Sequence, residues 1–476
     1  MGTINSALSL MSGALDADQA ALNIVANNVA NASTAGYTEE TANFQENDPL
    51  TINGISYGQG VMETGATSMR DKVLTERLDQ QQQLASASSA RLTALQSVQG
   101  LFTPDSDSST SSTAGDIGSD LTSFFDSFSS LESEPTSNSL RQNVLSTAGT
   151  LASDISGAAT SLNSQKAALD QEAGGVTSQV NALTTSIAQL NQQIMTTSPD
   201  TDAGTLEDQR EEDVSQLSKL VGINQITTEN NGLAITTTSG SLLVSERTSY
   251  QITNGTVDGV THFFVGSADI TPGLTTGGGE LGGYLTARDT DIPTAQASLD
   301  QLAYSVSTQV NSLNNAGTDL DGDTGTTASP LNIFSEPTEV AGSAALMSVA
   351  MTDPNKIAAA ASGKGTGNDT NAIAMAALNS STATIVNGQT PTNYYSSFVS
   401  TLGATVSEVE TENTAQVASV TQLQTQNGAL SSVNLNDEAS TMTTFERCYQ
   451  AASQVFTTIN TIMASALNLG NETTVS

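Results

Sequence analysis

Apolar residues recur at alternating steps of three and four near both ends of the chain, within residues 4–29 and 435–466, and only Asp18 interrupts the first series. A strict seven-residue repeat of this kind forms a narrow stripe that meets another helix. The sequence therefore predicts that two terminal helices pair and that the stripes form an assembly interface. The N-terminal positions are Ile4, Leu8, Met11, Leu15, Leu22, Val25 and Val29. The C-terminal positions are Leu435, Met442, Phe445, Tyr449, Ala452, Phe456, Ile459, Met463 and Ala466.

Between these ends the periodicity changes several times. Frequent glycines and sparse apolar residues in 44–63 favour extended or hairpin segments, and strand-like alternation from Ile223 to Val265 predicts a small β region. Pro104 and the Ser/Asp run to Ser112 are expected to close the second helix, which begins near Thr67. The other helices expected from the pattern cover 115–131, 138–165, 167–196, 205–221, 284–315 (with Pro293 as a first-turn residue or a kink), 393–427 and 435–468.

These elements predict a mainly α fold with a small β region. We expect an elongated, multi-domain chain with coiled-coil-like paired N- and C-terminal helices, a helical-bundle middle domain and a β-containing insert. The expected segments are an N-terminal helix and extended segment at 1–66 that pairs with 428–476, a helical bundle at 67–222, the β region at 223–283, a helix returning to the bundle at 284–325, an Ala/Gly-rich outer segment at 326–392, a bundle helix at 393–427 and the C-terminal helix at 428–476.

Composition narrows the classes of function. The chain has 476 residues, with 13 Lys and Arg against 49 Asp and Glu, and its net charge of -36 opposes binding to nucleic acid or to anionic membranes. No run approaches the ~18 consecutive apolar residues of a membrane span. The first ten residues lack the basic start and apolar core of a cleaved secretion signal. Aromatic residues make up 4% and Trp is absent, so we expect packing through small aliphatic contacts spread along helices.

One acidic loop has the spacing of a cation site. Asp319, Asp321 and Asp323 alternate as in a calcium-binding loop. The sixth position of such a loop calls for Gly and the twelfth for Glu, where this chain has Thr324 and Pro330. A solvated turn is therefore favoured over a metal site. The run Gly363 to Gly367 resembles a phosphate-binding loop only in composition, and a turn is favoured there too.

No catalytic constellation is recognisable. His262 is the only histidine and has no nucleophile motif to serve, so we expect it to be a partly buried strand residue. The acidic pair Glu211 and Glu212 lies on a charged helical stretch. Cys448 is the only cysteine and is expected to be a small buried residue. We expect no enzyme activity, no cofactor and no metal.

A motif at the end of the first helix is more specific. Residues 26–38 read ANNVANASTAGYT, and the motif positions are Asn27, Asn28, Asn31, Gly36 and Tyr37. This segment closely resembles the signature of bacterial flagellar rod, hook and hook-associated proteins. The C-terminal run from Val433 to Ala439, followed by Phe445, 449–452 and 467–469, resembles the other end of the same family.

Internal segments are similar to the hook-associated members in particular. They comprise 282–285 with Arg288 and Asp289, then Leu299, Leu302, Ala303 and Asn311, then 317–323. Simple hook proteins are mostly β between their termini, whereas this chain is expected to be helical through 67–221.

The resemblance implies a structural protein of the junction between hook and filament, with paired terminal helices in an inner tube. It implies a ring-forming homo-oligomer that contacts hook protein and hook-associated protein 3. It also implies export without a cleaved signal peptide to an extracellular flagellum, with an export chaperone on the C-terminal helix. A hook or distal-rod protein and a secreted helical adhesin or effector stay open as alternatives.

Two interpretations of the motif also stay open. Its asparagines can bond backbone groups at a helix end, Gly36 can turn the chain and Tyr37 can anchor the exit, which describes a helix cap. The same cap would set where the next segment leaves the tube. Because a lone monomer would leave both stripes in water, we expect the terminal helices to become ordered on assembly.

Overall fold

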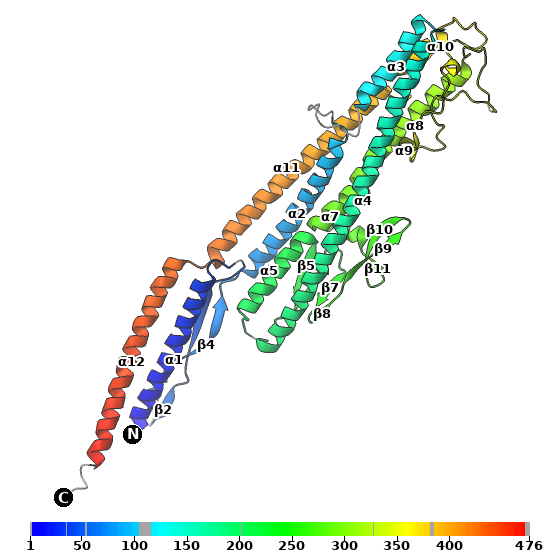
Figure 1. Cartoon of the computed structure of the whole chain (residues 1–476). Coiled ribbons are helices and arrows are strands. Elements are labelled where there is room, and N and C mark those ends of the chain that lie inside the picture. The colour runs from blue at the N-terminus through cyan, green and yellow to red at the C-terminus, as the bar shows by residue number, and fades with distance from the viewer. Residues whose placement is uncertain are drawn as a thin grey trace. The chain divides into compact units, whose positions relative to one another are not determined.

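The computed structural model describes residues 2–34, 36–52, 55–103, 116–199, 201–326, 328–380 and 385–471. It is mainly helical with small antiparallel sheets, which confirms the predicted fold class (Figure 1). The helices are α1 (Gly2–Asn31), α2 (Lys72–Gly100), α3 (Ile117–Ser133), α4 (Asn138–Thr197), α5 (Thr205–Leu220), α6 (Thr271–Thr275), α7 (Gly279–Thr286), α8 (Ile292–Ala316), α9 (Ser343–Leu346), α10 (Thr370–Ser380), α11 (Pro391–Ser431) and α12 (Leu435–Asn471), with a π-helical turn at Ala287–Asp291 and a 3-10 turn at Pro354–Lys356.

The strands form small antiparallel sheets. β1 pairs with β4 around a bulge at Asn43 and Phe44, and β2 pairs with β3. The other two sheets have the strand orders β5-β6-β7-β8 and β11-β10-β9. The strands are β1 (Glu40–Glu46), β2 (Leu50–Ile52), β3 (Ile55–Tyr57), β4 (Val61–Ser68), β5 (Ile223–Thr227), β6 (Leu233–Thr237), β7 (Leu242–Ser245), β8 (Thr248–Ser249), β9 (Ile252–Val257), β10 (Val260–Val265) and β11 (Ala268–Asp269).

The chain divides into two compact units. Unit 1 comprises Met1–Ala85, Thr177–Gly279 and Gln416–Ser476, and unit 2 comprises Ser86–Val176 and Glu280–Ala415. Unit 1 contains the terminal helices, the strands and α5, while α3, α8 and α10 belong to unit 2. Helices α2, α4 and α11 contribute residues to both.

Unit 2 has a continuous apolar core. Its aromatic residues gather in one place: the ring of Phe124 lies 5.1 Å from that of Phe125 and 5.3 Å from those of Phe128 and Phe334, measured between centroids. These edge-to-face contacts join α3 to the segment before α9. Aliphatic side chains along α4 and α8 complete the core. In this part of the core, aromatic contacts add to the expected aliphatic ones.

In unit 1, side-chain amides hydrogen bond to the backbone of the first residue in each of two edge strands. Gln83 of α2 accepts from the backbone N–H of Ile223 at 3.2 Å and donates to its carbonyl at 3.1 Å. Asn181 of α4 makes the same two bonds to Ile252, each at 2.8 Å. A side-chain amide has the donor and acceptor that a neighbouring strand would supply, so these helices fasten the β region without a further strand.

Two predicted boundaries differ from the structure. The separate helices expected at 138–165 and 167–196 are one helix, α4, because Gln165, Lys166 and Ala167 contain no helix breaker. The second helix begins at Lys72 and not near Thr67, since Thr67 still pairs with Thr41 in the β1–β4 ladder. The Asp71 carboxylate accepts from the N–H groups of the first turn and caps α2. The expected end at Pro104 to Ser112 lies outside the described residues.

Pro293 occupies the first turn of α8, which is one of its two predicted roles. The π-helical turn lies directly before it and carries Arg288, whose side chain is buried. The Arg288 guanidinium contacts Asp170 at 2.6 Å and Asp289 at 2.7 Å. The wide turn thus directs a charged side chain into unit 2, where two carboxylates neutralise it.

A pair of carboxyl groups connects α3 and α4 in unit 2. Asp120 hydrogen bonds with Asp154, and Oδ2 of Asp120 is buried without a hydrogen-bond partner among the described residues. Burial first, and then Asp154 and Asp116, raise the pKa of Asp120 to about 7. Because the folded chain holds a proton that the unfolded chain releases near the ordinary pKa of 3.8, this group favours folding at low pH and opposes it as the pH rises through 7.

We expect Asp120→Asn to raise the free energy of unfolding of the chain at about pH 8 by on the order of 1 kcal/mol, since the amide needs no proton. The gain should vanish at about pH 4, where the wild-type carboxyl is protonated. Denaturant unfolding followed by far-UV circular dichroism at both pH values measures this difference. The control is Asp126→Asn on the exposed face of the same helix. An equal gain from both variants at pH 8 would contradict the assignment.

Candidate functional site

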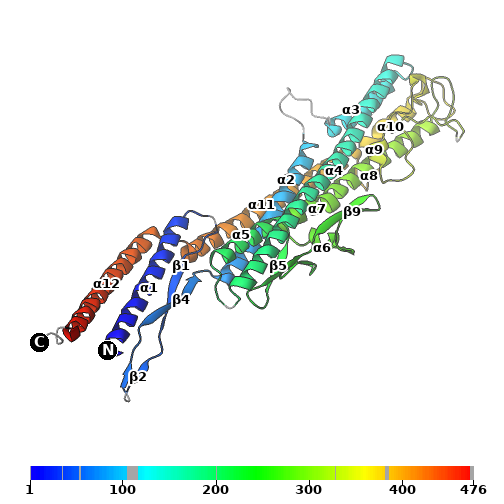
Figure 2. The ribbon, with the colours of Figure 1, turned by 60° about the horizontal axis from the view of Figure 1, so that its bottom comes forward.

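The terminal helices α1 and α12 lie side by side and run antiparallel within unit 1 (Figures 1 and 2). On α12 the half-buried apolar positions repeat with the predicted spacing: Phe445, Ala452, Phe456, Ile459 and Met463. The ring of Phe445 lies 6.1 Å from that of Phe44 on β1, between centroids. Five of the nine predicted C-terminal positions therefore lie on the face of α12 that the rest of unit 1 partly covers.

On α1 the most buried positions are Ala17, Ala21, Val25 and Asn28, and only Val25 belongs to the predicted stripe. The side chains of Leu8, Met11, Leu15 and Leu22 are half-buried, Val29 is 43% exposed, and the side chain of Ile4 lies outside the described residues. The covered face is displaced because α1 contacts β4 as well as α12. The predicted N-terminal stripe is thus only partly covered in the single chain.

A second apolar row remains in solvent on α12. Leu435, Met442 and Tyr449 of the predicted stripe are 54%, 36% and 37% exposed, and Ile462, which lies outside that stripe, is 54% exposed. The other large exposed apolar side chains of this helix are Val455 and Leu467. Contiguous apolar surface on a helix pair is typical of a contact with another chain.

Asn28 joins the two terminal helices to the first strand. Its side chain is fully buried; the amide donates to the Glu40 carbonyl at 2.8 Å and to Oε1 of Glu438 at 2.9 Å. Its carbonyl oxygen accepts from the Glu40 N–H at 3.0 Å and from the Tyr37 hydroxyl at 2.8 Å. Both donors and both acceptor positions are satisfied, so Asn28 fixes α1, β1 and the start of α12 in one arrangement.

The remaining motif residues shape the exit from α1. Asn31 donates to the carbonyl oxygen of the Asn27 backbone at 3.1 Å, and Asn27 donates to the Tyr37 hydroxyl at 3.4 Å. Gly36 has a φ of 76°, which favours glycine, and a Cβ there would lie 3.1 Å from a carboxylate oxygen of Glu212. Burial raises the pKa of Tyr37, and Glu40 and Asp208 add to this effect, so its hydroxyl stays a donor.

A layer of charged residues next to the motif was not predicted. Thr38 donates to the Asp208 carboxylate from its N–H at 3.0 Å and from its hydroxyl at 2.8 Å. Arg70, buried between β4 and α2, binds Asp208 and Glu207, the latter at 2.7 Å. The N–H and hydroxyl of Ser68 both donate to Asp202 at 2.8 Å. These bonds fasten both ends of the β1–β4 hairpin to the start of α5, and the partners are too far apart in sequence for periodicity to connect them.

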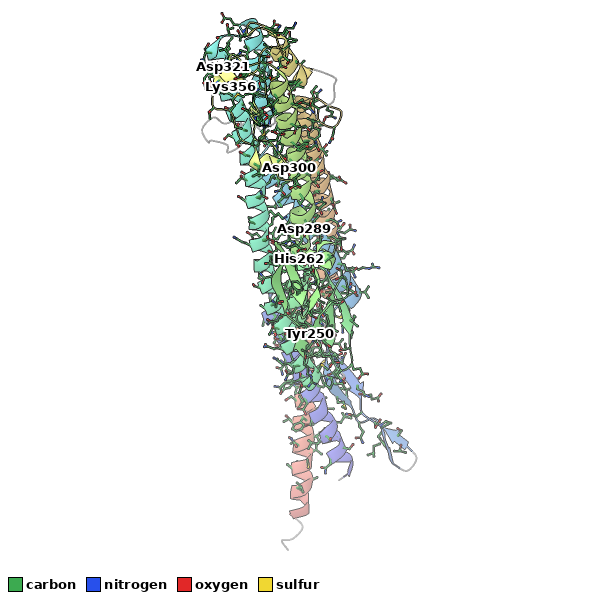
Figure 3. All side chains as sticks on the ribbon, turned by 90° about the vertical axis from the view of Figure 1, so that its right-hand side faces the viewer. Tyr250, His262, Asp289, Asp300, Asp321 and Lys356 are labelled. Atoms are coloured by element: carbon green, nitrogen blue, oxygen red, sulfur yellow. The ribbon has the colours of Figure 1, made fainter. Side chains whose placement is uncertain are left out.

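The expected acidic loop encloses a lysine. Nζ of Lys356 lies 3.0 Å from a carboxylate oxygen of each of Asp319, Asp321 and Asp323 (Figure 3). Asp319 is fully buried and also accepts from the Asp323 N–H at 2.7 Å. The ammonium occupies the place where a cation would bind. Among the described residues no cluster of His, Cys, Asp and Glu is arranged to hold a metal ion.

The other candidates for chemistry lie on three different elements. His262 is half-buried on β10, and its Nδ1 lies 2.7 Å from Asp269. Glu211 and Glu212 lie on α5, and burial raises the pKa of Glu211. Cys448 is exposed on α12, so the expectation of a buried thiol was wrong. This cysteine lies in the exposed stretch between the half-buried residues Phe445 and Ala452. In the described part of the chain, no helix is both long and apolar enough to span a bilayer.

Comparison with known proteins matches both ends and the middle of the chain. The helical domain of flagellar hook-associated protein FlgK matches residues 105–328, and the flagella basal body rod protein family matches residues 9–38, which include the Asn28 motif. Flagellar hook-associated protein 1 of Escherichia coli (strain K12) is 25% identical over 98% of this chain and 99% of its own length. The protein of the same name from Bacillus subtilis (strain 168) is 26% identical over 96% of each chain.

The fold has a solved counterpart. The flagellar hook junction protein FlgK from Burkholderia pseudomallei superposes with a TM-score of 0.65 at 18% sequence identity, covering 75% of this chain and 100% of that one. The likeness of fold, the near full-length relatives and the two matched segments agree with the motif that surrounds Asn28. By these comparisons the chain is similar to flagellar hook-associated protein 1 over nearly its whole length.

Proposed function

We propose that this chain is a non-enzymatic structural protein that joins hook to filament in the bacterial flagellum and assembles with copies of itself through α1 and α12. The observation that carries the proposal is the apolar surface left on this helix pair. Exposed side chains on α12, such as Leu435 and Ile462, together with Val29 on α1, have no covering element among the described residues of the single chain. Burying them between subunits stabilises an assembly by ~25 cal/mol per Å² of apolar surface.

In this proposal residues 1–66 and 428–476 form the inner domain of a ring, and the helical and β segments between them form outer domains. Hook protein and hook-associated protein 3 are the neighbours on either side. An export chaperone covers the C-terminal helix before the chain leaves the cell without signal cleavage. The exposed row on α12 supports this last step, because apolar helix surface needs cover in a free subunit.

We expect Ile462→Asp to abolish binding of the full-length chain to the tips of isolated hooks, since the substitution places a charge in the surface buried between subunits. Co-sedimentation with purified hooks measures binding, and far-UV circular dichroism checks that the helices are retained.

The matched control is Leu346→Asp on α9, where the side chain is 74% exposed and belongs to unit 2. This variant should bind hooks as wild type does. Equal loss in both variants would count against the terminal helices as the interface. A wild-type chain that forms a continuous polymer by itself would favour a hook or rod protein, and a wild-type chain that ignores hooks would favour a secreted adhesin or effector.

We also expect Gly36→Val to weaken hook-tip binding at least tenfold, corresponding to about 1.4 kcal/mol, because the left-handed backbone and the nearby Glu212 both oppose a side chain there. Gly240→Val is the control: its φ is 93°, but no atom lies within 4 Å of the added Cβ. The two variants carry similar backbone strain, so equal binding by both would show that the exit turn does not guide assembly.

A further inference from the structure

Glu438 joins the start of α12 to α1, but only one of its two carboxyl oxygens makes a hydrogen bond within the described residues. The whole residue is 5% exposed, and its Oε1 accepts from the Asn28 amide at 2.9 Å. Oε2 is buried and has no hydrogen-bond partner among the described residues. A carboxylate oxygen without a donor or a cation is costly to bury, whereas the neutral acid is not.

The groups around Glu438 are acidic or neutral. Asp437 precedes it on α12, and Glu39 acts on it from the residue before β1. Tyr37 also shares Asn28 with it. Burial raises the pKa of Glu438 most; the Asn28 hydrogen bond is the next largest effect and lowers it, and Glu39 and Asp437 raise it further.

No described cation compensates this carboxyl group. The Arg70 guanidinium, which acts on neighbouring Glu40, is already paired with Glu207 and Asp208 of α5. The Asn28 amide has given its second N–H to the Glu40 carbonyl, so it cannot solvate Oε2 as well.

We propose that the junction of α1 and α12 is a proton-linked latch, in which Glu438 takes up one proton from solvent on docking beside Asn28 and returns it when the helices separate. The pH dependence of docking is a property of the single chain. Only the role of this latch in assembly rests on the proposed function. One proton binds per docking event. The equilibrium constant for docking therefore falls by at most about tenfold per pH unit once the pH exceeds the ordinary pKa of a glutamate. Above the raised pKa of Glu438 the constant no longer changes with pH.

The native thiol permits a direct test in the full-length chain. Cys448 is exposed on α12, and Gln19→Cys would add one exposed thiol on α1. Spin labels on the two report the separation of the helices by pulsed electron paramagnetic resonance between about pH 4.5 and about pH 9. The docked, narrow distance population should fall as the pH rises in the wild type.

Glu438→Gln should keep the docked population constant over the same range, because its amide is neutral at every pH. Glu438→Met, which removes both oxygens, should dock less but with no dependence on pH, and it keeps the test valid if the glutamine variant folds poorly. Glu446→Gln, at an exposed position of the same helix, should follow the wild-type profile.

Identical pH profiles in wild type and Glu438→Gln, or no docked population in the wild type at any pH, would overturn the latch. Hook co-sedimentation of the same proteins separates this result from the proposed function. If docking depends on pH as expected but the chain does not bind hooks, only the proposed junction role is wrong. Hook binding with the same pH profile in both proteins would remove only the latch.

Discussion

The arrangement of the two chain ends depends on the four hydrogen bonds of one buried amide. Asn28 holds α1, the entry to β1 and the start of α12 together, and its partners Glu40 and Glu438 are separated by about 400 residues of other structure. Removing a buried group of this kind leaves its partners unpaired at a cost of about 1–3 kcal/mol each. A small polar group therefore sets the geometry, while the apolar surfaces beside it remain exposed.

The few Lys and Arg side chains of this chain also hold separate segments together. Arg70 joins the end of β4 to α5, Arg91 of α2 binds Asp291 at 2.8 Å, and Arg288 and Lys356 each contact more than one carboxylate. In a chain of net charge -36, each of these side chains fastens segments that would otherwise repel one another. The cost of burying them is offset because every charge has a partner with good geometry.

Periodicity predicted only part of the covered face of each terminal helix. A helix with a single apolar row toward its neighbours, such as the row from Phe445 to Met463, can be recognised from spacing alone. Helix α1 contacts both α12 and β4, so its buried positions, including Ala17 and Asn28, depend on two directions of contact that a seven-residue repeat does not describe. The motif indicated that Asn28 bonds backbone groups, whereas its bond to Glu438 and the pairing of Thr38 with Asp208 arise only from tertiary structure.

The lysine enclosed by Asp319, Asp321 and Asp323 makes this loop independent of dissolved ions. A calcium loop opens when the free ion becomes scarce, because its occupant exchanges with the surroundings. Lys356 is attached to the chain, so its local concentration does not vary with dilution or with chelators. This loop would therefore keep its shape in hard water, in soft water and in the presence of competing chelators alike.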